Sequence, residues 1–207
     1  MRIIEPSVEF IYPASKEDWD HETRNIEIAG RNCYKSEDRI EPGSAAKFAK
    51  RLTDLNHHAM IEFGSVMIRL ITDRACLVDL TRHRHVSFAV ESTRYCNYTK
   101  GKFGGEITFV KSVDLAEGTV EYEAWKEGLK DAEQRYFFMI EKGVKAQSAK
   151  LILPHSLKVD MIMKCNFREL LHILKLRTSK AAHPDVQNIM NMVYQHCHAH
   201  CPEVFTI

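Results

Sequence analysis

The sequence predicts an α+β fold, namely a helix-rich single domain over residues 1–207 with a small, mostly antiparallel sheet. Several segments repeat apolar residues at helical spacing behind a capping residue, while two segments have the β-branched or alternating pattern of strands. The connections between them are too irregular for a βαβ array. A chain of 207 residues with 44% hydrophobic content is long enough to bury one core.

Capping residues and apolar spacing define the elements of the first half of the chain. Ser15 and Asp18 have the spacing of a capping box, and the apolar residues after them recur at helical intervals. Ser44 is predicted to cap a second helix, and a later β-branched run with apolar residues on both faces favours a strand. The predicted elements are helix 16–34, a second helix capped by Ser44, strand 63–72 and helix 74–84.

The second half of the chain begins with a predicted surface loop, because residues 96–106 carry three glycines without periodicity. Alternation over 157–165 places every second apolar residue on one face of a strand. Asn166 and Glu169 then have the spacing of a helix cap. The predicted elements are helix 120–142 closed by Gly143, a short helix before Pro154, strand 157–165, a helix capped by Asn166, and a last helix from Pro184 to about His200.

Composition and charge argue against several classes of protein. The formal net charge of +1 disfavours nucleic-acid binding by net charge. No apolar run approaches the roughly 18–20 residues that cross a bilayer, and the first ten residues carry acids where a signal peptide is apolar. Six scattered cysteines are typical of free thiols in a reducing compartment. We therefore expect a cytoplasmic protein with neither membrane nor nucleic-acid partners.

The segment DLTRHRHVSFAVESTRYCNY, residues 79–98, concentrates hydrogen-bond donors in a nearly neutral chain. It contains Arg82, Arg84 and Arg94 together with histidines and hydroxyl side chains. A solvated basic turn is the simplest interpretation of such a charge run. Arginines combined with hydroxyls are also the groups that bind phosphate through paired hydrogen bonds. The residues alone leave a solvated turn and an anion-binding site as open alternatives.

The same segment carries a specific spacing. Arg82-His83-Arg84, followed by seven positions and Ser92, resembles the signature of the flavin-dependent thymidylate synthases, and the continuation STRY (92–95) is also similar to that family. Three further stretches resemble the family's motifs, so the resemblance covers nearly the whole chain. They are HHAMIEF (57–63), AKLILP (149–154) and NFRELLHILKLR (166–177).

The resemblance implies the fold of that family and its reaction. We expect a homotetramer with active sites at subunit interfaces, FAD as the cofactor, and dUMP, methylenetetrahydrofolate and NADPH as substrates. In that reaction NADPH reduces the flavin, and the folate's methylene carbon is joined to C5 of the uracil. Reduced flavin supplies the hydride that completes the methyl group, which gives dTMP and tetrahydrofolate. The resemblance implies no cysteine nucleophile.

The resemblance also implies which residues bind. Arg177 and Ser92 are the catalytic candidates, because a guanidinium beside N3 and O4 of the uracil stabilises negative charge there. Ser92 fits a positioning role better than a nucleophilic one, since the sequence places no base beside it. The FAD residues implied are His57, Ala59, Glu62, Arg82, His83, Arg84, Asn166, Phe167, Arg168 and His172. The dUMP residues implied are Asp79, Arg82, Val90, Glu91, Ser92, Thr93, Arg94, Lys150 and Arg177.

Four positions depart from the family pattern. Asp79 stands where many members have glutamine, and His172 stands where a polar amide is usual. Val90 occupies a position that is often glutamate, and Glu91 follows it, so the acid is shifted by one residue. Lys150 replaces a common arginine, which keeps the charge but loses the paired donors of a guanidinium.

The cluster HCHAHC, residues 196–201, is the competing candidate for chemistry. His196 with His200, and Cys197 with Cys201, fall at helical i,i+4 spacing, and each pair could chelate zinc. No second Cys-x-x-Cys completes a structural site and the resembled family uses no metal, so no metal site is predicted. Two other classes stay open. They are a metal-dependent hydrolase using His57, His58, His83 and His85, and a non-enzymatic RNA- or phosphate-binding module using the arginines.

Overall fold

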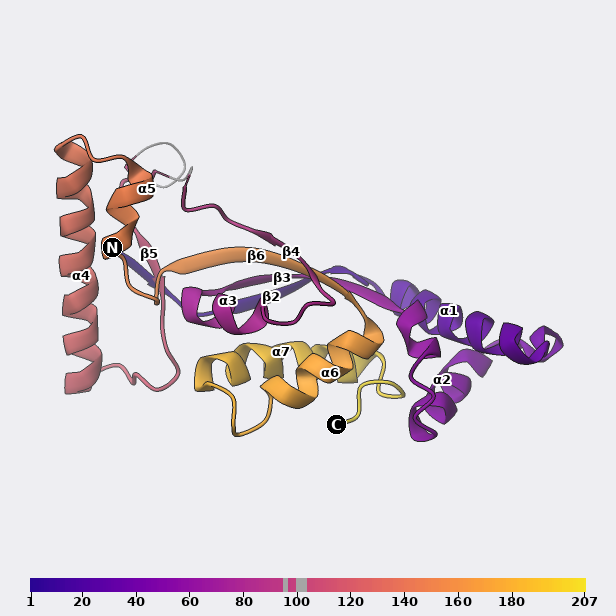
Figure 1. Cartoon of the computed structure of the whole chain (residues 1–207). Coiled ribbons are helices and arrows are strands. Elements are labelled where there is room, and N and C mark those ends of the chain that lie inside the picture. The colour runs from indigo at the N-terminus through magenta and orange to yellow at the C-terminus, as the bar shows by residue number, and fades with distance from the viewer. Residues whose placement is uncertain (95–96, 100–103) are drawn as a thin grey trace. The chain divides into compact units, whose positions relative to one another are not determined.

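The computed structural model describes residues 1–94, 97–99 and 104–207, and Figure 1 colours the elements by residue number. The chain folds into two compact units, each assembled from three segments. The first unit holds Met1–Ser7, Leu70–Arg82 and Ala89–Met161. The second unit holds Val8–Arg69, His83–Phe88 and Ile162–Ile207. A single domain over residues 1–207 stays a prediction, and each unit is described by itself.

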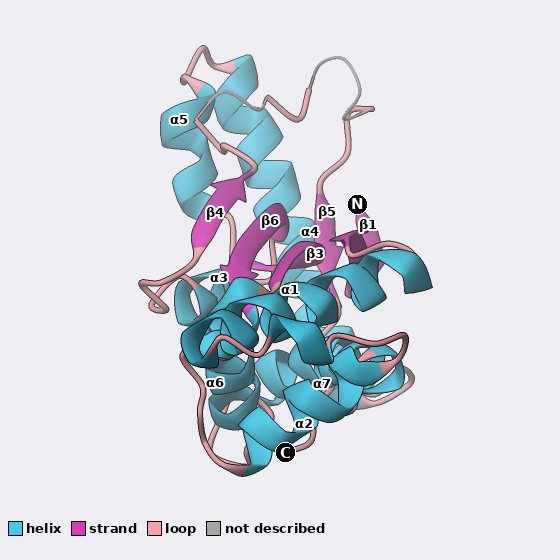
Figure 2. Cartoon of the chain, turned by 90° about the vertical axis from the view of Figure 1, so that its right-hand side faces the viewer, coloured by secondary structure: helices cyan, strands magenta, loops and turns pink. Residues whose placement is uncertain are grey.

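Helices make up most of the regular structure, as the cyan ribbons of Figure 2 show. The predicted helices are confirmed, and several begin at the predicted residue because capping groups fix where a helix starts. None of the helices within the described residues is long and apolar enough to cross a membrane. They are α1 Lys16–Tyr34, α2 Ser44–Asp54, α3 Arg74–Leu80, α4 Val120–Glu141, α5 Ala146–Ala149, α6 Phe167–Arg177 and α7 Pro184–His200, with short 3₁₀ turns η1 Glu37–Arg39, η2 Met60–Phe63 and η4 Lys150–Ile152.

The strands form two small sheets. β1 and β5 pair in parallel, and the larger sheet has the strand order β2-β3-β6-β4. Burial alternates along β6, which confirms the period-two pattern predicted for residues 157–165. The α+β class with a small, mostly antiparallel sheet is confirmed. The strands are β1 Arg2–Ile4, β2 Ser7–Tyr12, β3 Ser65–Asp73, β4 Ser87–Val90, β5 Thr108–Val110 and β6 Lys158–Asn166.

The first unit has its own apolar core beneath α4. Tyr136 is fully buried and its ring meets that of Tyr98 edge to face at 5.7 Å. Glu133 is also buried, and its carboxylate accepts a hydrogen bond of 2.7 Å from the backbone N–H of Ile107. A carboxylate taken out of water needs such partners. This bond therefore ties α4 to the approach to β5.

The core of the second unit is aromatic. Phe167 is fully buried, with its ring 5.8 Å from Trp19 and 5.0 Å from Phe205. Gly64 lies against this ring, and a Cβ added there would come within 2.6 Å of it. The backbone N–H of Phe167 also donates to the Gly64 carbonyl at 2.9 Å. Only glycine fits this contact, which fixes the start of α6 against the turn before β3.

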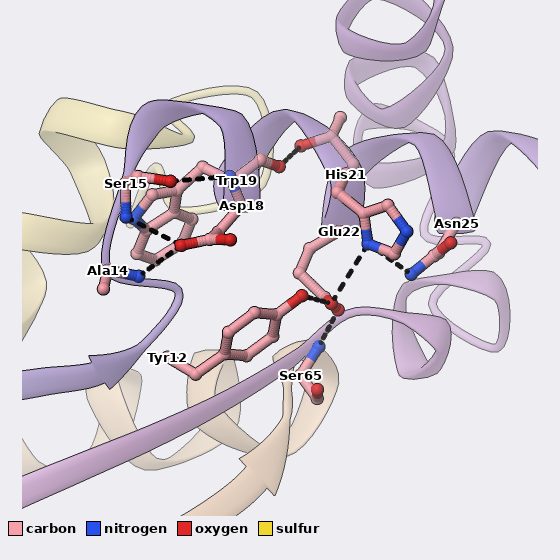
Figure 3. A network of polar contacts seen from close by, with 10 residues as sticks. Tyr12, Ala14, Ser15, Asp18, Trp19, His21, Glu22, Asn25 and Ser65 are labelled. Carbon is pink, nitrogen blue, oxygen red and sulfur yellow. Dashed lines mark hydrogen bonds and ion pairs between the residues drawn. The ribbon is translucent and has the colours of Figure 1, made fainter.

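A buried carboxylate joins β2, α1 and β3 in the second unit, as Figure 3 shows. Glu22 accepts hydrogen bonds from the Tyr12 hydroxyl and, at 2.7 Å, from the backbone N–H of Ser65. The bond to Glu22 is the main reason why the pKa of Tyr12 rises to about 12, and burial adds to it. In the same view Ser15 and Asp18 form the predicted capping box of α1.

Some predictions of element ends were wrong. Gly43, with φ of 81°, is the N-cap of α2, whereas Ser44 is its first residue and donates to Glu27 at 2.8 Å. The predicted helix 74–84 ends at Leu80, so the arginines of the signature follow it in turns. Part of the predicted loop 96–106 lies outside the described residues. The short strands β1, β2, β4 and β5 were not predicted, because strands of three to six residues carry little local pattern.

Candidate functional site

The residues predicted to bind FAD and dUMP divide between the two units. Every predicted FAD residue except Arg82 belongs to the second unit, and every predicted dUMP residue except Arg177 belongs to the first. Tyr95 of the STRY stretch lies outside the described residues.

A cavity of about 660 Å³ in the second unit brings four predicted FAD residues together. Glu62 comes from η2, and the other three come from the N-cap and the first two turns of α6, about a hundred positions later in the chain. The remaining lining residues include two histidines, His58 and His85, the positively charged Lys175 and the carboxylate of Glu169. The four predicted residues are Glu62, Asn166, Arg168 and His172.

The capping of α6 and the pattern of its exposed side chains determine which of its residues line this cavity. Asn166 caps the helix, because its side-chain oxygen accepts a 2.8 Å hydrogen bond from the Glu169 backbone N–H. Arg168, His172 and Lys175 are exposed and follow one another at helical spacing, while leucines on the other side are buried. Arg168 forms an ion pair of 2.6 Å with Glu62. This pair links η2 to α6 at the edge of the cavity.

His83, the middle residue of the signature, is buried in the second unit and accepts a 3.1 Å hydrogen bond at Nε2 from Arg177 Nε. Its Nδ1 lies 3.8 Å from a carboxylate oxygen of Glu169, and its ring is 6.1 Å from that of His172. Because Nε2 accepts, the proton of the neutral imidazole is on Nδ1, toward Glu169. The geometry therefore joins the signature to the predicted catalytic arginine.

A second cavity, of about 500 Å³, contains two more predicted FAD residues, His57 and Ala59. It shares His58 and Arg168 with the larger cavity. Burial and the positive charges of Lys175 and Arg168 lower the pKa of His58, which favours its neutral form at neutral pH. The sequence motifs did not indicate His58 as part of the FAD site. The position of His58 in both cavities depends on contacts with α6, which lies far away in the sequence. Local sequence patterns do not reveal such contacts.

Phe167 and Arg84 are two predicted FAD residues that lie outside both cavities. The side chain of Phe167 is fully buried in the aromatic core, so only its backbone is available to a ligand. Arg84 is exposed in the turn before β4. His83 likewise lines neither of the two cavities.

In the first unit, two lysines hold the predicted nucleotide segment Glu91–Arg94. Lys150 Nζ donates to the Thr93 hydroxyl at 3.0 Å. Lys158 Nζ forms a 2.7 Å ion pair with Glu91, in which the two side chains are 24% and 15% exposed. The structure therefore brings Lys150 to the segment, as the sequence predicts, and adds Lys158, which the sequence does not indicate.

The other predicted nucleotide residues of the first unit flank this segment. The Ser92 hydroxyl accepts a 3.3 Å hydrogen bond from the Arg94 backbone N–H, which closes a tight turn. Val90 is exposed at the end of β4. Asp79 is half-buried on α3, and Arg82 is exposed just after that helix. Exposed arginine and serine side chains on a turn can reach a phosphate from several directions.

The cluster at residues 196–201 is packed into the second unit. His196 stacks on Phe10 with ring centroids 3.9 Å apart, and His200 stacks on Trp19. Cys197 and Cys201 are buried, and burial raises the pKa of both thiols, that of Cys201 to about 12. Within the described residues, no three His, Cys, Asp or Glu side chains are placed to hold a metal ion. Cys96 lies outside that part of the chain.

Comparison with known proteins gives consistent matches over most of the chain. A family profile described as Thy1, thymidylate synthase complementing protein, matches residues 17–203. The chain is 28% identical to the flavin-dependent thymidylate synthase of Pyrococcus furiosus over 79% of this chain and 67% of that one. It is 25% identical to the flavin-dependent thymidylate synthase of Mycobacterium tuberculosis over 87% of this chain and 77% of that one.

A solved structure has the same fold. The crystal structure of a UMP/dUMP methylase, PolB from Streptomyces cacaoi, bound with 5-Br dUMP, superposes with a TM-score of 0.77. The match covers 99% of this chain and 95% of that one, at 21% sequence identity. At this identity the likeness establishes the fold alone.

Proposed function

Because the chain belongs to the thymidylate synthase complementing protein family, we propose that it is an FAD-dependent thymidylate synthase that methylates dUMP. This membership confirms the resemblance found in the sequence. In the proposed reaction dUMP, methylenetetrahydrofolate, NADPH and a proton give dTMP, tetrahydrofolate and NADP⁺. The folate provides one carbon, and NADPH provides the two electrons that reduce this carbon to a methyl group.

The observation that carries the proposal is the cavity of the second unit that gathers Glu62, Asn166, Arg168 and His172. Its volume of about 660 Å³ is within the range of cofactor sites. Lys175 supplies positive charge for a pyrophosphate, and Arg168, although its charge is paired with that of Glu62, adds guanidinium donors beside it. Leu171 gives an apolar wall for a ring. The residues present thus fit a flavin dinucleotide. When bound, FAD supplies hydride chemistry to the site.

The turn at Glu91–Arg94 suits a nucleotide phosphate. Lys150 supplies an ammonium next to the Thr93 hydroxyl, and the arginine of the turn adds a guanidinium. Ser92 accepts from the backbone of the same turn, and its only hydrogen bond within the described residues is this one. A serine nucleophile needs a base beside it. We therefore assign Ser92 to positioning the phosphate of dUMP.

Arg177 is assigned to the uracil ring. Its Nε is held by His83 at 3.1 Å, and His83 in turn lies beside Glu169. This contact orients the guanidinium of Arg177. A guanidinium placed at N3 and O4 would stabilise the negative charge that develops when C5 attacks the methylene carbon.

No cysteine acts as the nucleophile in this proposal. Four of the five described cysteines are buried, and Cys33 is exposed. Burial raises the pKa of Cys165 and Cys201 to about 12 and that of Cys197 well above its usual value. Such thiols are almost entirely protonated at neutral pH, and the protonated form is a poor nucleophile.

The test begins with the visible spectrum of the purified protein, before and after NADPH is added. An oxidised-flavin spectrum that bleaches with NADPH supports the first half of the reaction. Separation of the products by chromatography, with dUMP or UMP as acceptor and methylenetetrahydrofolate as donor, then tests the methyl transfer. A colourless protein that takes up no added FAD would overturn the proposal. Methylation of UMP in preference to dUMP would overturn the assigned substrate.

A further inference from the structure

A third hollow in the second unit has a chemistry of its own. It measures about 660 Å³ and lies among α1, η1 and α2. Its walls contain guanidinium, hydroxyl and aromatic groups, and none of its lining residues is acidic. The polar lining residues are Arg31, Arg39, Arg51, Tyr34, Ser36 and His57. Such a set fits a ligand that joins an aromatic ring to a strongly anionic group.

Arg31 is fixed in place before any ligand arrives. Its Nε donates to Glu27 at 2.7 Å, where the two side chains are 11% and 1% exposed. The second oxygen of Glu27 accepts from the Ser44 hydroxyl at 2.8 Å. The guanidinium also lies over the Phe48 ring, with Cζ 4.7 Å from the centroid. Bonded at one edge and stacked on one face, Arg31 keeps its terminal nitrogens for another acceptor.

The other two arginines face solvent. Arg39 and Arg51 are exposed, and in the described part of the chain neither forms an ion pair. Tyr34 is 77% exposed next to them, although a tyrosine ring usually buries much of its area. An exposed aromatic face flanked by guanidiniums is a common surface for stacking a base and binding its phosphate.

This hollow continues toward the proposed flavin cavity. It shares Tyr34 and His57 with the cavity of about 500 Å³, which in turn shares His58 and Arg168 with the flavin cavity. All these residues belong to the second unit. A long ligand could thus place one end among the arginines while its other end reaches the flavin.

We infer that this hollow binds the adenosine 2′-phosphate end of NADPH. The inference rests on the proposed function, because it presumes a reductant that must reach a flavin. Three arginines match a phosphate dianion, and Tyr34 matches the adenine ring. NADH has no 2′-phosphate, so the site would also make the enzyme select NADPH. The carboxylates of the folate's glutamate are the other anions in the reaction that could use the same arginines.

The test compares Arg39→Gln, Arg51→Gln and the double variant with the wild-type protein. Binding of NADP⁺ and of NAD⁺ to the flavin-loaded protein is measured by calorimetry, and flavin reduction by NADPH and NADH is followed separately. We expect NADP⁺ affinity to fall about ten-fold for each arginine, as for a lost charge-assisted hydrogen bond. NAD⁺ affinity should stay within about two-fold. Arg135→Gln, an exposed arginine paired with Asp131 on α4, is the control and should bind NADP⁺ normally.

Two results would overturn the inference. One is wild-type NADP⁺ affinity in the double variant, and the other is equal binding of NADP⁺ and NAD⁺ by the unaltered protein. If the double variant instead loses affinity for tetrahydrofolate alone, the arginines serve the folate's carboxylates and the inference is wrong. Circular dichroism would verify that the exposed substitutions leave the fold intact. Failure of the proposed function is distinguishable, because it appears as a protein that takes up no FAD.

Discussion

Arg177 is the residue whose removal tests the chemistry most directly. Replacing it with alanine should lower dTMP formation about a hundred-fold or more, the usual effect of losing one donor to a developing anion. Flavin should stay bound, because Glu62, Asn166, Arg168 and His172 still line the cavity. The measurement pairs the flavin absorbance of Arg177→Ala with its rate of dTMP formation. Arg177→Lys keeps the charge without the guanidinium and should be intermediate, whereas normal turnover of the alanine variant would refute the role.

The ion pair between Lys158 and Glu91 gives a second prediction at this scale. Glu91 lies in the proposed phosphate segment, so its charge must be compensated before a dianion can bind nearby. Lys158→Met should raise the KM for dUMP about ten-fold, for a repulsion on the order of 1 kcal/mol. The kcat should change little. Steady-state kinetics with varied dUMP measures both constants.

A second substitution separates charge from structure at this pair. If Lys158 acts by neutralising Glu91, the double variant Lys158→Met, Glu91→Gln should recover most of the lost affinity. A tether that only holds the turn would not be restored in this way, so an unrecovered KM would contradict the prediction. Lys164→Met is the matched control, because Lys164 is exposed on the same strand.

At the residue scale, the sequence could indicate only those candidate site residues that belong to one contiguous motif. The spacing of Arg82-His83-Arg84 and Ser92 is visible in one segment of chain. Lys158 and His58 could not be found in this way, because their partners Glu91 and Lys175 are distant in sequence. The hollow around Arg39 and Arg51 likewise depends on how η1 and α2 pack. Side-chain pairs of this kind appear only once the fold is known.

At the element scale, helices followed from local signals more closely than strands did. The predicted range 16–34 matches α1, because its capping box is contained in four consecutive residues. By contrast β1 pairs with β5, about a hundred positions later, and neither strand exceeds three residues. Short strands are defined by their partners more than by their own pattern. The sequence therefore predicted the helical framework and two central strands, but no strand order.

The hydrogen bond between Tyr12 of β2 and Glu22 of α1 leads to a prediction about how stability depends on pH. The pKa of Tyr12 is raised from 10.0 to about 12, chiefly by its hydrogen bond to Glu22. A raised folded pKa means that the unfolded chain loses the proton first. The stability that Tyr12 contributes is therefore fully present below pH 10 and is lost as pH rises toward 12. Tyr12→Phe should cost about 1–2 kcal/mol at pH 8, and less at pH 11.

Urea unfolding of the wild-type protein and Tyr12→Phe at both pH values would measure this difference. Because the comparison is between two proteins at one pH, the titration of other groups cancels to first order. Glu22→Gln removes the carboxylate that raises the pKa and should flatten the same pH window. A constant gap between wild type and Tyr12→Phe from pH 8 to 11 would show that the bond to Glu22 does not control this titration.

At the scale of the whole molecule, the amino-acid composition along the chain does not reveal the division into two units. The borders between the units fall at 7/8, 69/70, 88/89 and 161/162, within β2, β3, β4 and β6, and at 82/83, within the signature. No linker rich in glycine, serine or proline marks them, since strands run through them. The same borders separate most predicted FAD residues from most predicted dUMP residues.

The homotetramer with shared active sites that the family resemblance implies leads to the last prediction. Arg94 of the first unit and Arg177 of the second unit are both assigned to dUMP. If different subunits supply them to one site, Arg94→Ala and Arg177→Ala are each inactive alone but complement each other when mixed. Random exchange of subunits would leave roughly a quarter of the sites with both arginines. The rate of dTMP formation after the two variants are dissociated and reassembled together should therefore approach that fraction of the wild-type rate.

Reassembly of each variant by itself is the control. Mixed tetramers, identified by native mass spectrometry, that remain inactive would mean that one subunit supplies both arginines.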